Sequence, residues 1–284
     1  MKIERAGAFS PTALTELWNL GYTGYFVPVQ FTEALFAQHV RAGNIDLDSS
    51  LVLVDGEAPA AFSFLGRRGE RGWIGGVGVV PTHRGKGIAH ELFAEHMSLA
   101  RRVGLTRVVL EVLRQNWAQK VYARAGFATT RNLMMLAGTL PRAASAAEGV
   151  RTVTEEAFFA HHARLHAAFP ACWQREVESL QAASTPGAIE VLALGPADAP
   201  TGMLMLGMQN GAVRIRDGAA LDEAAAEVLL AAVSARYPGA SLTLVNEPEG
   251  SPLHRVLLAM GFVEKLVQHE MVWTGSSTCL PEHG

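Results

Sequence analysis

Along the first half of the chain, the spacing of hydrophobic residues alternates between helical and strand-like. Apolar residues at helical spacing predict helices over 11–20 and 32–41, and Ser10 is a residue type that often caps a helix start. Helices are also predicted over 87–102 and 117–125. The predicted strands of this half cover 51–54, 58–65, 73–80, 108–113 and 127–140.

A similar order of elements recurs in the second half. The pair Gly126-Phe127 follows the last short helix of the first half, and Gly261-Phe262 follows its counterpart 135 residues later. We infer an internal duplication with diverged sequence, the alternative being two unrelated α/β domains. Predicted helices cover 154–166, 173–181, 221–236 and 253–260, and predicted strands cover 189–194, 202–208, 212–215, 241–245 and 262–273.

These patterns divide the chain into a first domain over 1–140 and a second over 150–274. The Ala- and Ser-rich segment 141–149 is typical of a linker, and 275–284 is typical of a loose tail.

The composition excludes several classes of protein. Hydrophobic residues make up 49% and charged residues 18%, so the chain can build a substantial core. A net charge of −3 argues against nucleic-acid binding. We find neither a membrane-length apolar run nor a signal peptide, so we expect a cytoplasmic protein. Cys172 and Cys279 are far apart in sequence and are expected to be free thiols.

The segment Arg84-Gly85-Lys86-Gly87-Ile88-Ala89 links a β-branched strand that ends at Pro81 to a predicted helix. Glycines allow close backbone approach, and a helix start presents N–H groups without acceptors and a positive dipole end. The loop therefore suits a phosphate or pyrophosphate ligand. It is not a Walker loop, because Gly87 stands where that motif has Ser or Thr, and it lacks the three spaced glycines of a dinucleotide fingerprint.

This loop resembles the pyrophosphate loop of the GNAT superfamily of N-acetyltransferases, which has the pattern Arg/Gln-x-x-Gly-x-Gly/Ala. Leu110-Glu111-Val112 and the segment from Tyr122 to Phe127 follow in the family's order. The resemblance covers about residues 1–140. It implies an α/β (α+β) fold with two tandem GNAT-like domains, each a mixed, largely antiparallel twisted sheet flanked by helices.

The resemblance implies a role for each matching residue. Backbone N–H groups of 85–89 would bind the pyrophosphate of acetyl-CoA, and Val77 and Val79 would pair with its pantetheine arm. Tyr122 would be the general acid that protonates the departing thiolate. The implied cofactor-binding residues are Val77, Val79, Arg84, Gly85, Lys86, Gly87, Ile88, Ala89, Asn116 and Tyr122.

Two positions at or after the predicted strand 108–113 leave alternatives open. The family often has Asn seven residues before the Tyr, whereas here Gln115 is seven before it and Asn116 is six before it. We assign the role to Asn116. Glu111 to Asn116 matches the Glu-Val-x-x-x-Asn spacing of ribosomal-protein N-terminal acetyltransferases, which makes Glu111 the candidate base, or else a strand residue that faces solvent.

Other features carry less information. Tyr25 and Phe26 fall where the family builds its acceptor wall, so they are candidate substrate contacts. Phe62, Phe64 and Trp73 are predicted to be core residues. His161, His162 and His166 suggest a metal site, but without a nearby carboxylate motif we expect no metal.

The second copy lacks the chemical residues of the first. Its segment 214–221 has one glycine, and Asp217 is an acid where the pyrophosphate would lie, while Leu257 replaces the Tyr. We interpret it as a degenerate domain that completes the acceptor pocket, extends the sheet or dimerises, so a homodimer stays open.

The sequence thus predicts an N-acetyltransferase that moves acetyl from acetyl-CoA to a primary amine, on a small molecule or a protein, by direct attack without a metal. It predicts neither nucleic-acid nor membrane partners. The alternative is a non-catalytic acyl-CoA sensor or interaction protein. A donor with a longer acyl chain also stays open.

Overall fold

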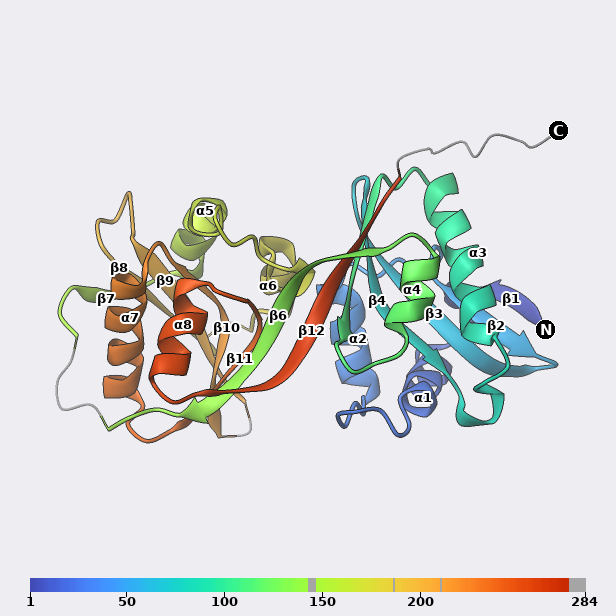
Figure 1. Cartoon of the computed structure of the whole chain (residues 1–284), viewed down its shortest axis with the longest axis horizontal. Helices are drawn as coiled ribbons and strands as arrows, with labels where there is room; N and C mark the ends of the chain where they lie inside the picture. Colours follow the sequence, from blue (N-terminus) through green and yellow to red (C-terminus); the bar gives the residue numbers. More distant parts are fainter. Residues whose placement is uncertain (143–146, 186, 210, 276–284) are drawn as a thin grey trace. The chain divides into compact units, whose positions relative to one another are not determined.

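The computed structural model describes residues 1–142, 147–185, 187–209 and 211–275. One order of elements occurs twice along the chain (Figure 1). The first copy consists of β1 (Lys2–Arg5), α1 (Pro11–Gly21), α2 (Glu33–Ala42), β2 (Leu51–Asp55), β3 (Ala58–Arg68), β4 (Arg71–Val79), α3 (Ile88–Arg102), β5 (Arg107–Leu113), α4 (Gln119–Arg124) and β6 (Ala128–Thr139). The second consists of β7 (Val150–Val153), α5 (Glu155–Leu165), α6 (Val177–Ala183), β8 (Ile189–Leu194), β9 (Gly202–Gln209), β10 (Ala212–Ala220), α7 (Glu223–Arg236), β11 (Ser241–Pro248), α8 (Pro252–Ala259) and β12 (Val263–Thr274).

Side-chain caps fix the starts of several helices. Ser10 accepts a hydrogen bond from the N–H of Ala13 at the start of α1, and Pro11 occupies the first helical position. Thr32 caps α2 and Thr154 caps α5 in the same way. The capped starts agree with the helices that the hydrophobic spacing predicts.

Some elements differ from the sequence prediction. The four-residue strands β1 and β7 were not predicted, and their pairing with β2 and β8 makes them strands. The helix predicted over 173–181 is a 3-10 turn (Trp173–Arg175) followed by α6. The strand predicted over 212–215 continues to Ala220.

The chain forms two compact units, and each of two long strands runs from one unit into the other. Unit 1 contains Met1–Thr130 and the chain from Glu270, and unit 2 contains Arg131–His269. Strand β6 therefore begins in unit 1 and continues in unit 2, and β12 does the reverse. Residues 143–146 of the expected linker and 276–284 of the expected tail lie outside the described residues.

In unit 1 the strand order is β1-β2-β3-β4-β5, followed by the end of β12. The first three pairs are antiparallel, and β4–β5 is parallel. Successive β3 residues face opposite layers: Phe62 and Phe64 stack on Trp18 of α1, whereas Ser63 contacts His96 of α3. Helices α1 and α2 therefore cover one face of the sheet, and α3 covers the other.

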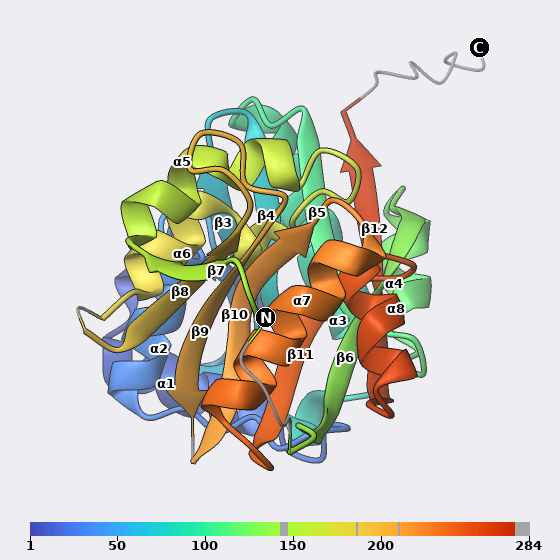
Figure 2. The same ribbon diagram turned by 90° about the vertical axis from the view of Figure 1, so that its left-hand side faces the viewer.

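Unit 2 repeats this layering. Its strand order is β6-β11-β10-β9-β8-β7, and β10–β11 is parallel. Leu229 and Val233 of α7 share one buried cluster with α8 and strand residues, while Phe158 of α5 and Leu180 of α6 share another. Figure 2 shows α7 and α8 lying across one face of the strands. Each copy is thus a mixed, largely antiparallel sheet flanked by helices, as expected.

No helix in the described part of the chain is both long and apolar enough to cross a membrane. Cys172 is a buried free thiol, as predicted. Cys279 lies outside the described residues.

Candidate functional site

The parallel strands β4 and β5 separate partway along their length. The register ends at the pair Trp73↔Val109. Two residues further, Gly75 forms a β-bulge, because Leu65 of β3 faces Ile74 and the preceding residue, Phe64, faces Gly76. A bulge bends a strand and changes where its groups point. The separation therefore follows from a local change in β4.

Beyond the bulge, β4 directs two peptide groups toward the side of β5. Val80 donates its N–H to the carbonyl of Ala60 in β3 at 2.9 Å. Because successive peptide groups of an antiparallel strand point to opposite sides, those of Val77 and Val79 face away from β3. These are the two residues that the sequence assigns to the pantetheine arm.

The glycine loop leads directly into α3. Gly85 and Gly87 have φ values of 76° and 78°, and a Cβ at either would meet no atom of the described chain within 4 Å. Gly87 is the N-cap of α3, so the N–H groups of Ile88 and Ala89 lack intrahelical acceptors. Open space, exposed amides and the positive helix end together suit a phosphate group.

Arg84 contacts backbone oxygens near this loop. Its Nε donates to the carbonyl of Val79 at 3.0 Å, and its Nη2 donates to those of Gly21 and Thr23 at 3.0 and 2.8 Å. Arg84 thus ties the segment after α1 to the end of β4. Its assignment to cofactor binding stays a prediction, and this positioning role was not foreseen.

Three tyrosines and Asn116 gather in the region where β4 and β5 separate. The ring centroids of Tyr22 and Tyr25 lie 5.1 Å apart. The side chain of Asn116 hydrogen-bonds to the Tyr25 phenol, and its Oδ1 accepts from the N–H of Ala118 at 2.9 Å. The Tyr25 phenol is close enough to Tyr122 to raise the pKa of Tyr122. The structure therefore brings together Tyr122, Asn116 and Tyr25.

Burial sets the protonation of the tyrosines. Tyr122 is 9% exposed, and its ring centroid lies 4.9 Å from that of Phe93. Burial, followed by Tyr25, raises the pKa of Tyr122 above its ordinary value. Burial likewise raises the pKa of Tyr22, against a backbone hydrogen bond from Val77. Both phenols are therefore protonated at neutral pH.

The contacts of Asn116 bear on the choice between two neighbouring residues. Gln115 is exposed, whereas Asn116 is partly buried and bonded to Tyr25. These contacts support Asn116 for the position that the sequence left between them. Phe26 is 50% exposed and its ring centroid lies 5.3 Å from that of Tyr25, so it lies at the edge of the aromatic group.

Glu111 lies two residues beyond the last paired residue of β5. Leu110 and Val112 belong to the core cluster that includes α3, so Glu111 points to the face covered by α1 and α2. Its Oε2 accepts a hydrogen bond from the indole N–H of Trp73 at 2.7 Å. Trp73 is buried, as predicted. Its hydrogen bond to Glu111 was not indicated by any sequence pattern.

The start of α7, the long helix of the second copy, has an acidic N-cap residue where α3 has a glycine. The carboxylate of Asp222, the N-cap of α7, accepts from the N–H of Ala225 at 2.8 Å. A carboxylate on these amides occupies the place of an anionic ligand and repels it. Leu257, the counterpart of Tyr122, is fully buried in a hydrophobic cluster.

Asp217 was predicted to lie at the start of this helix, and that prediction is wrong. Asp217 lies within β10 and is 0% exposed, because β10 continues to Ala220 and the helix begins only at Glu223. Its carboxylate instead forms ion pairs inside unit 2. The conclusion that this copy lacks the anion site now rests on Asp222.

Residues 13–127 match the model of the acetyltransferase (GNAT) family. The matched segment contains the glycine loop, Glu111, Asn116 and Tyr122. The match to this family thus covers most of the first copy. No curated protein sequence matches the chain.

Solved structures share the fold over nearly the whole chain. A GCN5-related N-acetyltransferase from Sphaerobacter thermophilus has a TM-score of 0.67 at 15% identity, covering 96% of this chain and 95% of that one. A tandem GNAT protein from the clavulanic acid biosynthesis pathway has a TM-score of 0.67 at 14% identity, covering 98% and 100%. A putative acetyltransferase from Pyrococcus horikoshii has a TM-score of 0.65 at 15% identity, covering 96% and 89%. The chain thus has a tandem GNAT fold.

Proposed function

We propose that this protein is an acetyl-CoA-dependent N-acetyltransferase that modifies a primary amine where β4 and β5 separate. One observation carries the proposal: β4 stops pairing with β5 at Trp73 and then leads to a helix start at Gly87 that suits an anion. A donor with a pyrophosphate at one end and a thioester at the other suits this arrangement.

Donor binding uses backbone groups in this proposal. The N–H groups of 85–89 hold the pyrophosphate, and Lys86 adds positive charge. The carbonyl of Val77 and the N–H of Val79 pair with the amides of the pantetheine arm, in the manner of an added strand, since the N–H of Val77 bonds to Tyr22 and the carbonyl of Val79 accepts from Arg84. Open space beside Gly85 and Gly87 supports the fit of a bulky phosphate group.

The chemical step is direct transfer. The amine nitrogen attacks the thioester carbonyl, a C–N bond forms and the C–S bond breaks, giving an amide and the CoA thiol. Glu111 takes the proton that the amine loses, directly or through water, and Tyr122 gives its proton to the departing sulfur. Backbone N–H groups near Val79 polarise the carbonyl oxygen.

The raised pKa of Tyr122 is compatible with an acid role. Burial keeps the phenol protonated, so the proton is present when the C–S bond breaks. The same low-dielectric surroundings disfavour a free thiolate, which raises the affinity of the sulfur for that proton. Tyr25 and Phe26 are proposed to line the acceptor side.

A panel of primary amines tests the proposal. Each amine, from small metabolites to peptide N-termini and lysine peptides, is incubated with acetyl-CoA and the protein, and release of CoA thiol is measured. We expect amine-dependent release for at least one acceptor class. Tight acetyl-CoA binding with no release for any amine would contradict it and favour the non-catalytic sensor. Longer acyl-CoA thioesters in the same assay test the donor preference.

A further inference from the structure

Unit 2 contains a buried group of ionisable side chains that the proposed acetyl transfer does not use. His162 and His166 lie four residues apart at the end of α5, and Asp217 lies on β10. The Nε2 atom of each imidazole is 3.1 Å from the same oxygen, Oδ2 of Asp217. The absence of a nearby carboxylate, expected from the sequence, is therefore wrong: the fold supplies one from a strand 51 residues further along.

The buried charges around Asp217 balance only with a further cation, which is either a proton on an imidazole or a metal ion. Arg175 donates from Nε to Oδ1 of Asp217 and from Nη1 to Oε2 of Glu247, both at 2.6 Å. One guanidinium thus faces two carboxylates, and all three groups are buried. The remaining negative charge falls on the side of the imidazoles.

The tautomer of His166 gives a second reason to expect a cation next to Asp217. Its Nδ1 lies 3.2 Å from the carbonyl oxygen of Phe169, a pure acceptor, so Nδ1 carries the proton. A neutral imidazole has only one N–H, so Nε2 then presents a lone pair. That lone pair faces Oδ2 of Asp217 at 3.1 Å, an arrangement that is repulsive unless a cation lies at the contact.

We propose that Nε2 of His162, Nε2 of His166 and Oδ2 of Asp217 form a Zn²⁺ site. Without zinc, Nε2 of His162 also lies 3.0 Å from the carbonyl oxygen of Arg175, and zinc would replace the proton of that contact. The three atoms lie within 4.8 Å of one another. Ligand atoms of a tetrahedral zinc site, ~2.0–2.1 Å from the metal, lie about 3.3 Å apart, close to the spacing here. Two histidines four apart on one helix are a recurrent zinc-binding arrangement, and imidazole and carboxylate are both ligands that zinc accepts.

The surroundings also fit a metal site. A backbone carbonyl that accepts from the second nitrogen of a histidine fixes the tautomer that binds metal, and Phe169 does this for His166. Arg175 occupies Oδ1 of Asp217 and leaves Oδ2 to the imidazole side. A divalent ion offsets the remaining negative charge that the carboxylates leave.

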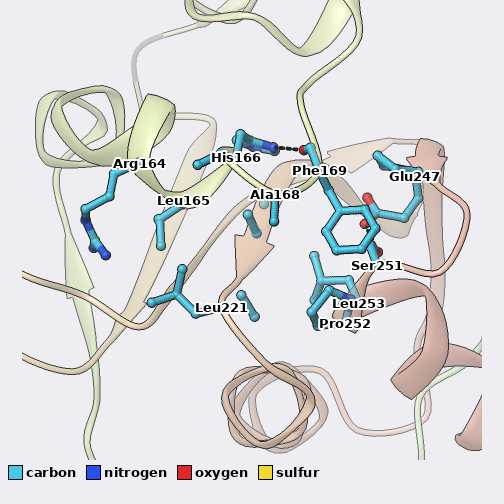
Figure 3. A pocket seen from close by; sticks show the side chains of 15 residues that line it. Arg164, Leu165, His166, Ala168, Phe169, Leu221, Glu247, Ser251, Pro252 and Leu253 are labelled. Carbon is cyan, nitrogen blue, oxygen red and sulfur yellow. Dashed lines mark hydrogen bonds between the residues drawn. The ribbon is translucent and has the colours of Figure 1, made fainter. Parts of the chain in front are cut away.

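A cavity lies beside His166, one of the three proposed ligands. It has a volume of about 110 Å³ and is lined by His166, Phe169, Glu247 and Leu253 among others (Figure 3). Figure 3 shows the His166 imidazole at one wall, bonded to the Phe169 carbonyl. A water molecule occupies ~30 Å³ in the liquid, so the cavity can hold water near this ligand.

Zinc titration of the full chain tests the proposal. The protein is stripped with a chelator and titrated with Zn²⁺ in competition with a chromophoric chelator. We expect one tight ion per chain, with affinity reduced at least ~100-fold in His162→Ala and in His166→Ala. His161→Ala is the matched control, since His161 is on the same helix but only half-buried, and its Nε2 contacts the carbonyl of Ala197. It should bind zinc as the unchanged protein does.

A second measurement needs no substitution in the buried cluster. Co²⁺ bound to the stripped, unchanged protein should give the strong visible absorption of a four-coordinate site, and Zn²⁺ should displace it. Zn²⁺ should also raise the thermal unfolding temperature of the protein and of His161→Ala, but not of His166→Ala.

The proposal is overturned if the unchanged protein binds Zn²⁺ no more tightly than His166→Ala, or if bound Co²⁺ shows only the weak spectrum of the hydrated ion. A proton would then be the cation beside Asp217. None of these readouts depends on acetyl transfer, so the two proposals fail separately.

Discussion

At the scale of single residues, the proposed acid Tyr122 takes its properties from its position. Its phenol is buried and protonated, and it lies near Tyr25, which bonds to Asn116. Tyr122→Phe removes only the hydroxyl and keeps the packing against Phe93. We expect turnover to fall ~100-fold or more, while the Kd for acetyl-CoA stays within about twofold.

Steady-state kinetics and calorimetric titration of Tyr122→Phe measure these two quantities. Tyr237→Phe is the control, because it removes a phenol that bonds to Glu190 within unit 2 and has no part in the proposed transfer. Unchanged turnover in Tyr122→Phe would exclude Tyr122 as the acid.

His96 makes a prediction about stability and pH. It is 0% exposed, and burial lowers its pKa from the ordinary 6.5 to about 4. The unfolded chain therefore binds a proton more readily than the folded chain. Between pH 6.5 and 4, stability falls as pH falls, by ~1.4 kcal/mol per pH unit from this residue.

Denaturant unfolding at several pH values measures that slope. His96→Gln, which keeps a polar group toward Ser63, should show a shallower slope over the same range. Equal slopes for the two proteins would show that His96 does not contribute.

The motif residues were predictable from the sequence because short-range spacing defines them. Tyr122, Asn116 and the loop 84–89 were identified from their spacing in this way, and their roles stay predictions. The contacts of Trp73 with Glu111 and of Arg84 with three carbonyls join segments far apart along the chain, so no local pattern contains them.

At the scale of elements, the glycine loop and α3 form the anion site. Gly87 has a φ of 78°, so Gly87→Ala strains the backbone by ~1–2 kcal/mol and places a methyl group in the open space where a phosphate would lie. We expect the Kd for acetyl-CoA to rise at least ~10-fold, with little change in turnover at saturation.

Gly69→Ala provides the matched control. Gly69 also has a positive φ, 59°, and open space, but it lies in the turn between β3 and β4. It should cost similar stability and leave acetyl-CoA binding unchanged. Equal Kd values for the two variants would place the phosphate elsewhere.

Helices were predicted well because their apolar periodicity and their caps are local. β1 and β7 were missed because only pairing with a neighbour makes such short segments strands. The length of β10 was also missed, for two reasons. A bulge beside Arg216 shifts the alternation of inward and outward side chains along the strand. Asp217 is also a residue type common in loops, and its burial depends on the ion pair with Arg175, which no local pattern contains.

At the scale of the whole molecule, the end of β12 belongs to unit 1, so residues near the C-terminus contribute to the core of the proposed catalytic unit. Trp273 is 5% exposed and belongs to the same core cluster as Tyr122, and the guanidinium of Arg101 lies 5.0 Å from its ring centroid. We expect Trp273→Ala to destabilise unit 1 by ~3–5 kcal/mol.

Thermal and denaturant unfolding, followed with acetyl-CoA binding, measure this effect. Trp117→Ala is the control, because Trp117 is 66% exposed and should change stability little. If Trp273→Ala is as stable as Trp117→Ala, the C-terminal segment does not complete the core of unit 1.

The duplication could be predicted because the repeated order of elements survives in the hydrophobic pattern. The strand exchange could not, because β6 and β12 have the same alternation whichever unit they join. The pairing of Asp217 with His162 and His166 was hidden for a related reason, since it depends on tertiary contact alone.

The central claim is that acetyl-CoA binds to the first copy, between the start of α3 and Tyr122. An experimental structure of the protein with bound CoA tests it most directly. The account predicts one CoA per chain, with its pyrophosphate on the amides of 85–89 and its sulfur within hydrogen-bond reach of the Tyr122 hydroxyl. A pyrophosphate at the start of α7, or a sulfur remote from Tyr122, would contradict it.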